Sequence, residues 1–347
     1  MKRPLLVKRD KVIRGSQGIA FVLGIAIALV LGAILLWTSG SDPFEVYDRM
    51  WTSSLGSSAG LENTMNRAVP LALAGLAVAI AGTMGLWNIG ADGQIMAGAM
   101  GAAWVARIGD GWDGPVLITA MIAGGVIGGL IWALGPALAR AHLGVNEIIT
   151  TLMLNEVAIR LATYLIQGRW KDPDSLGFPV ATPLPDQAQM PSILGDVHLG
   201  AVLALAVVAA IAFLITRTTW GYELRVAGSS SASALYAGIS LRRKILVVVL
   251  MSGGIAGIAG AVELSAGGSR LTENLSNGYG FAGIIVAALA LMRPYAIVPV
   301  AVVFGAVQVG GNAIRTLDVS SAVSGILQAL ILMGALIVGV LMAYRVR

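Results

Sequence analysis

Polar side chains and glycines interrupt an apolar part of the sequence near residue 90. The interrupting residues are Gly85, Asn88, Gly90, Asp92, Gly93 and Gln94. Backbone broken inside a membrane helix frees N–H and C=O groups that protein or water must satisfy. Two interpretations stay open: a broken helix that lines a cavity, or an ordinary turn in which Asp92 caps the next helix. The amide and carboxylate groups there would suit hydrogen bonds to a polar solute.

A second polar group follows near residue 150. Asn146 and Glu147 precede an apolar run, and Asn155, Glu156 and Arg160 lie within it. Glu156 and Arg160 are four residues apart, so on a helix they share a face and can form an ion pair. Because intramembrane charges are costly, we expect this face to point into the protein interior. It is either part of a polar pathway or an internal staple between helices.

Catalytic chemistry is not expected from this chain. It has no cysteine, which excludes disulfides, iron–sulfur clusters and thiolate chemistry. His142 and His198 fall in separate loops, so we predict neither a metal site nor a histidine-based catalytic site. No GxxxxGK[ST] motif is present, and any nucleotide energy must therefore come from another chain.

The composition is that of a polytopic membrane protein. Of 347 residues, 57% are hydrophobic, only 12% are charged and 45 are glycine, which is far from the balance of a soluble domain. The basic residues flank apolar spans and form no separate basic domain, which argues against nucleic-acid binding. We predict an all-α membrane helix bundle in a single domain, residues 1–347.

The apolar runs predict about ten transmembrane helices. They lie near 17–37, 67–87, 92–108, 115–139, 147–167, 199–216, 245–264, 279–292, 296–314 and 320–343. The polar and glycine-rich run 274–283 opens a span much as 85–94 does, and two matching interruptions point to internal repeats. Gly124 with Gly128, Gly125 with Gly129, and Gly253 with Gly257 form GxxxG pairs, which predict close helix packing.

Basic residues predict the orientation of the bundle. One set precedes the first span: Lys2, Arg3, Lys8, Arg9, Lys11 and Arg14. The others on the same side are Arg140, Arg217, Arg225, Arg242, Arg243, Lys244, Arg293, Arg345 and Arg347. The positive-inside rule then places both termini in the cytoplasm. We interpret the first span as retained, because no convincing signal-peptidase site follows it.

Three connections are long enough to have structure. In 39–67 we expect a short helix around 44–51, and the proline-rich 168–200 should be extended. The basic segment 217–244 has two short helical patterns, one bracketed by Gly221 and Gly228 and one from Ser229–Ser231 to Gly238. It is either a docking surface for a partner protein or a solvated loop whose charges fix topology.

Several motifs resemble the permease subunits of bacterial ABC importers for nucleosides and simple sugars, a branch related to ribose and branched-chain amino-acid permeases. They are Gly85-Leu-Trp-Asn-Ile-Gly-Ala-Asp-Gly-Gln, Gly144-Val-Asn-Glu-Ile-Ile-Thr-Thr-Leu-Met-Leu-Asn, Gly221-Tyr-Glu-Leu-Arg-Val-Ala-Gly with Ala234-Leu-Tyr-Ala-Gly-Ile, and Gly280-Phe-Ala-Gly-Ile-Ile-Val-Ala-Ala-Leu-Ala. The resemblance covers residues 60–340. Asp92, Trp87 and Ser229 depart from the usual Glu, Phe and Asn of such proteins without removing a chemical capability.

This resemblance implies a permease in the bacterial cytoplasmic membrane that imports nucleosides. It implies three partners: a second permease subunit, a cytoplasmic ATPase that binds ATP and Mg²⁺, and an extracytoplasmic binding lipoprotein or periplasmic protein. The expected solute path comprises Asn88, Asp92, Gln94, Asn155 and Glu156. The expected ATPase-coupling residues are Gly221, Leu224, Arg225, Gly228, Ala234 and Gly238.

Other functions stay open at this stage. A simple sugar such as ribose would fit the same features. An ion-driven secondary transporter would use Asp92, Glu147 or Glu156 as its titrating group. A phosphorylated nucleotide is disfavoured, because Arg160 is the only basic residue deep within the predicted spans.

Overall fold

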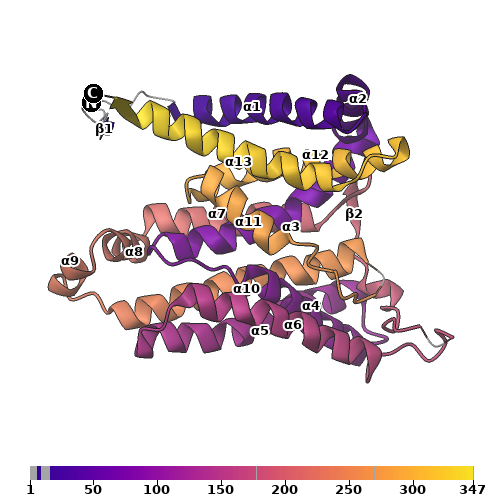
Figure 1. Ribbon diagram of the computed structural model, residues 1–347. Coiled ribbons are helices and arrows are strands. Elements are labelled where there is room, and N and C mark those ends of the chain that lie inside the picture. The colour runs from indigo at the N-terminus through magenta and orange to yellow at the C-terminus, as the bar shows by residue number, and fades with distance from the viewer. Residues whose placement is uncertain (1–5, 9–15, 177, 269, 347) are drawn as a thin grey trace. The chain divides into compact units, whose positions relative to one another are not determined.

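Helices account for nearly all of the regular structure in the computed structural model, which describes residues 6–8, 16–176, 178–268 and 270–346 (Figure 1). The long helices are α1 (Ser16–Thr38), α3 (Ser58–Gly82), α4 (Ala91–Ile108), α5 (Gly114–Leu138), α6 (Glu147–Gln167), α7 (Gly200–Arg217), α10 (Leu241–Gly267), α12 (Pro294–Ala313) and α13 (Ala322–Ala343). The shorter ones are α2 (Pro43–Ser54), α8 (Thr219–Ser229), α9 (Ser231–Tyr236), α11 (Tyr279–Leu289), η1 (Ala139–Leu143), η2 (Asp186–Ala188) and η3 (Ile314–Leu317). The all-α membrane fold is therefore confirmed.

Each of the ten predicted spans coincides with a helix, but not all ten are equally suited to crossing a membrane. Within the described residues, eight helices are long and apolar enough to span a bilayer. The helix α4 has 18 residues but is built mainly of alanine and glycine with polar residues in its first turn, and α11 has only 11 residues. Polar interruptions thus shorten or weaken the two helices that follow them.

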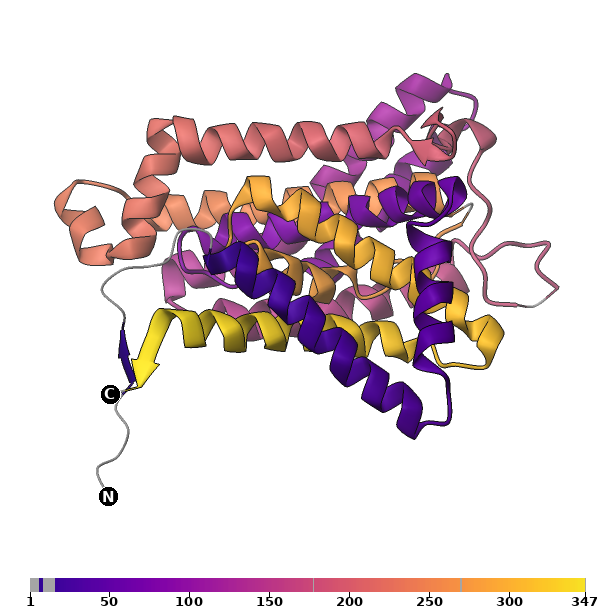
Figure 2. The same ribbon diagram turned by 90° about the horizontal axis from the view of Figure 1, so that it is seen from above.

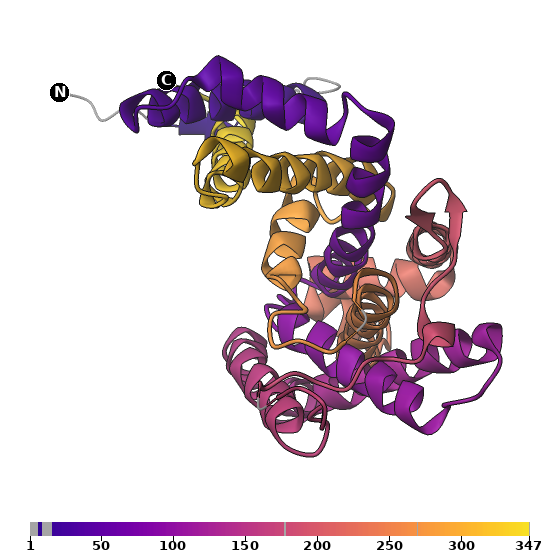
Figure 3. The same cartoon turned by 90° about the vertical axis from the view of Figure 1, so that its right-hand side faces the viewer.

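The chain forms two compact units. Unit 1 comprises residues 1–64 and 303–347, and unit 2 comprises 65–302. In unit 1, α1 and α13 lie side by side (Figures 1 and 3), and a Cβ on Gly24 would lie 2.6 Å from the backbone nitrogen of Ala335. The strands β1 (Leu6–Lys8) and β4 (Tyr344–Val346) pair antiparallel. The predicted helix around 44–51 is confirmed as α2, whose Val46 and Met50 pack against Leu36.

The centre of unit 2 is a close-packed group of α4, α5 and α10. On α5, Gly124 and Gly128 face α4, whereas Gly125 and Gly129 face α10. A Cβ on Gly129 would lie 2.1 Å from the carbonyl oxygen of Gly253, a distance that no real contact permits. The predicted glycine pairs are confirmed as packing devices, with one pair of α5 directed at each neighbour.

The connection 168–200 is less extended than its prolines predict. It contains η2 and a hairpin of β2 (Ser192–Leu194) and β3 (Val197–His198). Its first part is fastened to the α10–α11 loop by an ion pair of 2.8 Å between Asp172 and Arg270. Local pairing therefore shapes a segment for which composition alone predicts extended chain.

Residues near the N-terminus that bear on orientation lie outside the described residues. They are Lys2, Arg3, Arg9, Lys11 and Arg14, and Arg347 at the other end also lies outside. The orientation of the bundle stays a prediction.

Within unit 2, α7 leads into α8 and α9, from which α10 returns (Figure 2).

Candidate functional site

The predicted break between α3 and α4 is present at residues 83–90. The N–H of Leu86 donates to the carbonyl of Ala81, and Gly85 adopts a left-handed conformation with φ of +70°. These are the features of a glycine-terminated helix end, so Gly85 stops α3. The chain then runs without helical bonds to Gly90, which holds the N-cap position of α4.

Asn88 holds this break to two helices. Its side-chain nitrogen donates to the Oε1 atom of Gln94 at 2.6 Å and to the hydroxyl of Ser252 on α10 at 2.7 Å. Its side-chain oxygen accepts the N–H of Gly90 at 3.0 Å and a bond of 3.3 Å from the Gln94 amide. Asn88 and Gln94 are buried, and their amides satisfy each other within an otherwise apolar core.

Asp92 connects the first break to the second. Its carboxylate accepts the backbone N–H of Gly280 and the hydroxyl of Ser276, each at 3.0 Å. Gly280 lies in the first turn of α11, where a negative charge compensates the unpaired N–H groups and the helix dipole. A Cβ on Gly280 would lie 2.1 Å from the Asp92 nitrogen, so glycine is required for this approach. The alternative in which Asp92 caps its own helix is wrong.

Asn155 caps the N-terminus of α4 in the same way that Asp92 caps the N-terminus of α11. Its side-chain oxygen accepts the N–H of Gly93 in the first turn of α4 at 2.8 Å, and its nitrogen donates to the carbonyl of Ile89 at 2.9 Å. Both breaks are therefore followed by a helix whose N-terminus is capped by a side chain of another helix. This shared arrangement is the structural counterpart of the matching interruptions in the sequence.

Glu147 supports the break from the start of α6. It is 7% exposed, pairs with Arg140 at 3.2 Å, and accepts the backbone N–H of Trp87 at 3.3 Å. Asn146 caps α6 by accepting the N–H of Ile148. Together, Asn88, Asp92, Gln94, Asn155, Glu147, Ser252 and Ser276 form a cluster that we call the polar joint.

The expected interior ion pair on α6 is wrong. Glu156 and Arg160 are both exposed on the described chain and form no ion pair with each other. The buried face of α6 carries Thr151, Asn155 and Ala158 instead. Successive helical residues are about 100° apart, so a buried Asn155 turns Glu156 away from the core. Four of the five expected path residues meet in the polar joint, and Glu156 lies outside it.

The segment 217–244 folds as two short helices, as predicted, but its glycines pack internally. A Cβ on Gly228 would lie 2.2 Å from the Thr83 carbonyl oxygen, and one on Gly221 would lie 2.3 Å from that of Ile215. Leu224 is fully buried beside Leu86, and Arg225 donates to the carbonyl of Ile215. The helix α8 therefore packs directly on the chain that leads into the polar joint.

The outward surface of this segment differs from the one expected. Ala234 is fully buried and Gly238 serves the turn after α9 with φ of +74°, whereas Leu235 is 63% and Tyr236 97% exposed. The helix-capping role of Ser230 is confirmed, since its hydroxyl accepts the N–H of Ser233. Leu235 and Tyr236 are not among the residues expected from the sequence, because residue type does not show which side chains of α9 stay exposed.

Two members of the polar joint were also missed in the sequence. Ser252 lies in the middle of α10, where its hydroxyl donates to the carbonyl of Ala77, and Ser276 lies in the second interruption. A single hydroxyl directly before a GxxxG pair was the available signal for Ser252. Its partner cannot be deduced, because Asn88 is 164 residues away in sequence.

The fold is that of a polytopic helical membrane protein, and comparison with known proteins defines its family. Residues 60–341 match the model of the branched-chain amino acid transport system / permease component family. The chain belongs to this family, and its resemblance to ABC permeases is confirmed.

Three proteins of similar sequence are named as ABC transporter permeases. The chain is 34% identical to the glucose ABC transporter permease protein TsgB13 of Haloferax volcanii, over 90% of this chain and 85% of that one. It is 32% identical to the guanosine ABC transporter permease protein NupP of Bacillus subtilis, covering 83% and 84% of the two chains. It is 28% identical to the nucleoside ABC transporter permease protein NupB of Lactococcus lactis, covering 83% and 82%. It is thus a multi-pass permease component.

Proposed function

We propose that this chain is the membrane-spanning subunit of an ATP-driven importer in the bacterial cytoplasmic membrane, and that its solute is a nucleoside. The relatives named for guanosine and nucleosides support this solute. The polar joint agrees with a neutral solute, because it holds amides, hydroxyls and two carboxylates, each already matched by a helix N-terminus or by Arg140. A charged solute bound at the joint would call for a charge of opposite sign there that is left uncompensated.

One observation supports a solute path along α6: Glu156 and Arg160 are exposed in the middle of this apolar 21-residue helix. Lipid does not solvate such charges, which in membrane proteins face a water-filled cavity or another chain. We infer that this face of α6 lines an aqueous path completed by a second permease subunit. Asn155 on the adjacent face of α6 then links the path to the polar joint.

ATP hydrolysis belongs, in this proposal, to a separate cytoplasmic ATPase with its own Mg²⁺, so the permease holds no cofactor. The ATPase docks on α8 and α9 through Leu235 and Tyr236, the exposed large apolar residues of α9. An extracytoplasmic binding protein delivers the solute at the other end. Both termini of the permease are cytoplasmic in this arrangement.

Radiolabelled uptake in cells that carry the complete system tests the solute. We expect accumulation of guanosine or another nucleoside, competed by unlabelled nucleosides and unaffected by excess glucose or ribose. The glucose permease among the relatives makes a simple sugar the second candidate. Uptake competed by glucose or ribose and untouched by guanosine, adenosine, uridine and cytidine would establish the sugar and refute the nucleoside.

A further inference from the structure

A groove in unit 1 lies where α1 should meet the membrane surface. The 23 residues of α1 span about 35 Å at 1.5 Å per residue, close to the roughly 30 Å hydrocarbon core of a bilayer. Its last turn therefore reaches the boundary between lipid tails and headgroups. Trp37 in that turn is 77% exposed, and exposed tryptophan at a helix end is typical of this boundary.

The helix α2 continues along the same boundary. With 12 residues it is too short to cross a bilayer. Val46 and Met50 are buried on one face, whereas Phe44 is 86% and Trp51 61% exposed among charged residues of the other faces. A short amphipathic helix with exposed aromatics is suited to lying in the plane of the interface.

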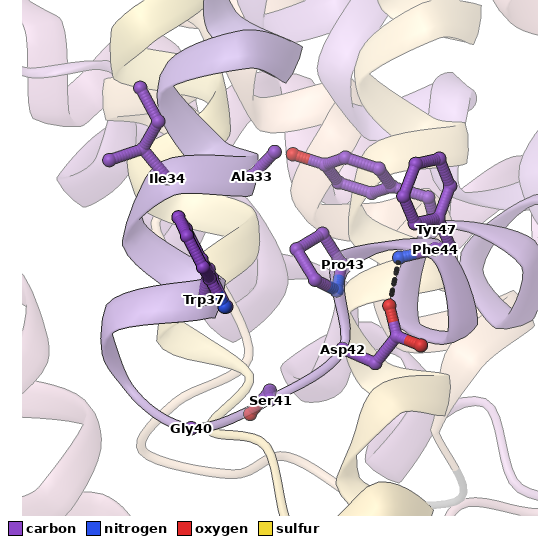
Figure 4. A pocket seen from close by; sticks show the side chains of 9 residues that line it. All are labelled: Ala33, Ile34, Trp37, Gly40, Ser41, Asp42, Pro43, Phe44 and Tyr47. Carbon is purple, nitrogen blue, oxygen red and sulfur yellow. Dashed lines mark hydrogen bonds between the residues drawn. The ribbon is translucent and has the colours of Figure 1, made fainter.

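The last turns of α1 and the first turn of α2 enclose a groove of about 680 Å³, here called the α1–α2 groove. Figure 4 shows Ile34 and Trp37 on one side and Pro43, Phe44 and Tyr47 on the other. The Tyr47 hydroxyl donates to the carbonyl of Leu29 at 2.7 Å, so this polar group is already occupied. The groove walls are thus apolar and aromatic.

The polar end of the groove is acidic. One carboxylate oxygen of Asp42 accepts the N–H of Phe44 at 2.9 Å and caps α2, and the exposed side chain forms no ion pair within the described chain. The Ser41 hydroxyl lies at the same end. A carboxylate at the polar end of an apolar groove complements an ammonium group, which can donate hydrogen bonds to it. An anionic headgroup would be repelled.

We propose that the α1–α2 groove binds a phospholipid with a primary amine headgroup, phosphatidylethanolamine. The ammonium group donates hydrogen bonds to Asp42, and one acyl chain follows Ile34 and Ala33 along α1 beside the ring of Trp37. The charge of Asp42 selects the headgroup, whereas the aromatic walls hold the acyl chain without selecting among headgroups. The site is independent of the solute path proposed above.

A fluorophore in the groove tests this directly, because the chain has no native cysteine. Ile34→Cys labelled with bimane, in the full-length permease in nanodiscs, reports contact with brominated acyl chains. We expect quenching by brominated phosphatidylethanolamine to exceed that by phosphatidylcholine, and phosphatidylglycerol to quench least. Asp42→Asn should remove this order, and it keeps the helix cap because asparagine caps as well as aspartate.

The control variants for Asp42 and Trp37 both lie on α2. Asp48→Asn removes an exposed carboxylate that does not line the groove, and it should leave the headgroup order unchanged. Trp37→Ala should lower quenching by all three lipids several-fold, whereas Trp51→Ala should not. Equal quenching by the three lipids in the starting protein, or an order that Asp42→Asn leaves intact, would overturn the proposal. Quenching by none of them would show that protein covers the groove and would overturn it too.

Discussion

The carboxylate of Asp92 accepts the backbone N–H of Gly280 at 3.0 Å and so joins the first turn of α4 to the first turn of α11. Asn155 makes the corresponding bond from α6 to Gly93 of α4. Three helices are thereby linked through the unpaired N–H groups of two helix ends. The two breaks are therefore connected through α4 by polar bonds.

Removing the Asp92 carboxylate should destabilise the permease. Asp92→Ala leaves the buried Gly280 N–H and Ser276 hydroxyl without their partner, which costs about 1–3 kcal/mol for each unsatisfied group. Asp92→Asn keeps an acceptor and should lose less. Thermal unfolding of the purified protein measures the relative stability of the two variants, and Asp110→Ala, at an exposed position, is the control. Equal melting temperatures for Asp92→Ala and Asp110→Ala would argue against a structural bond at Asp92.

The contact between α5 and α10 should tolerate no side chain at Gly257. A Cβ there would lie 2.1 Å from the Gly125 carbonyl oxygen, so Gly257→Ala forces the helices apart at a cost of about 1–3 kcal/mol. Gly254 lies on the same helix, and a Cβ on it meets its nearest atom only at 3.5 Å. Gly254→Ala should therefore unfold at the temperature of the unaltered protein. A similar fall in melting temperature in both variants would show that the loss does not come from the contact between α5 and α10.

Gly228 should matter for transport because α8 rests on the Thr83 carbonyl at this position. Gly228→Ala displaces α8 from the chain that leads into the polar joint, and we expect solute uptake to fall several-fold. Gly135→Ala is the matched control, since a Cβ on Gly135 meets no atom within 4 Å. Uptake assays should be normalised to the amount of permease in the membrane. Unimpaired uptake by Gly228→Ala would show that this contact does not link α8 to the joint.

Glu156 and Arg160 should act independently on the stability of the isolated chain, because they form no ion pair with each other there. The losses in melting temperature from Glu156→Gln and Arg160→Ala should add in the double variant. Uptake by the assembled system should nevertheless fall with either change, since both side chains face the proposed path. Marked non-additivity in the isolated chain would show that the two side chains do interact.

Docking of the ATPase should depend on the exposed end of α9. Tyr236→Ala removes a ring that is 97% exposed, so it should weaken co-purification of the ATPase and leave the melting temperature of the permease unchanged. Ala234→Trp, at a fully buried position, should instead lower the melting temperature itself. Undiminished co-purification with Tyr236→Ala would move the docking surface elsewhere.

The sequence by itself determined the local features of this protein. Apolar runs define the ten helices because a helix satisfies its own backbone within each run. Glycine and polar residues at 83–90 and 274–278 mark the breaks because their local conformation limits the helices: Gly85 follows the end of α3 and Gly278 precedes the start of α11, both with positive φ. The pairing of glycines on α5 was also visible, since helical periodicity puts residues four apart on one face.

Only the tertiary structure decided which groups meet and which face of each helix is buried. Asp92 and Gly280 are 188 residues apart, and no local signal connects a carboxylate on one helix to the N-terminus of another. The orientation of α6 likewise depends on its neighbours: burying Asn155 for the α4 cap turns Glu156 outward. Ala234 and Tyr236 show the same limit, because residue type suggests a docking contact but packing alone decides which side chain remains exposed.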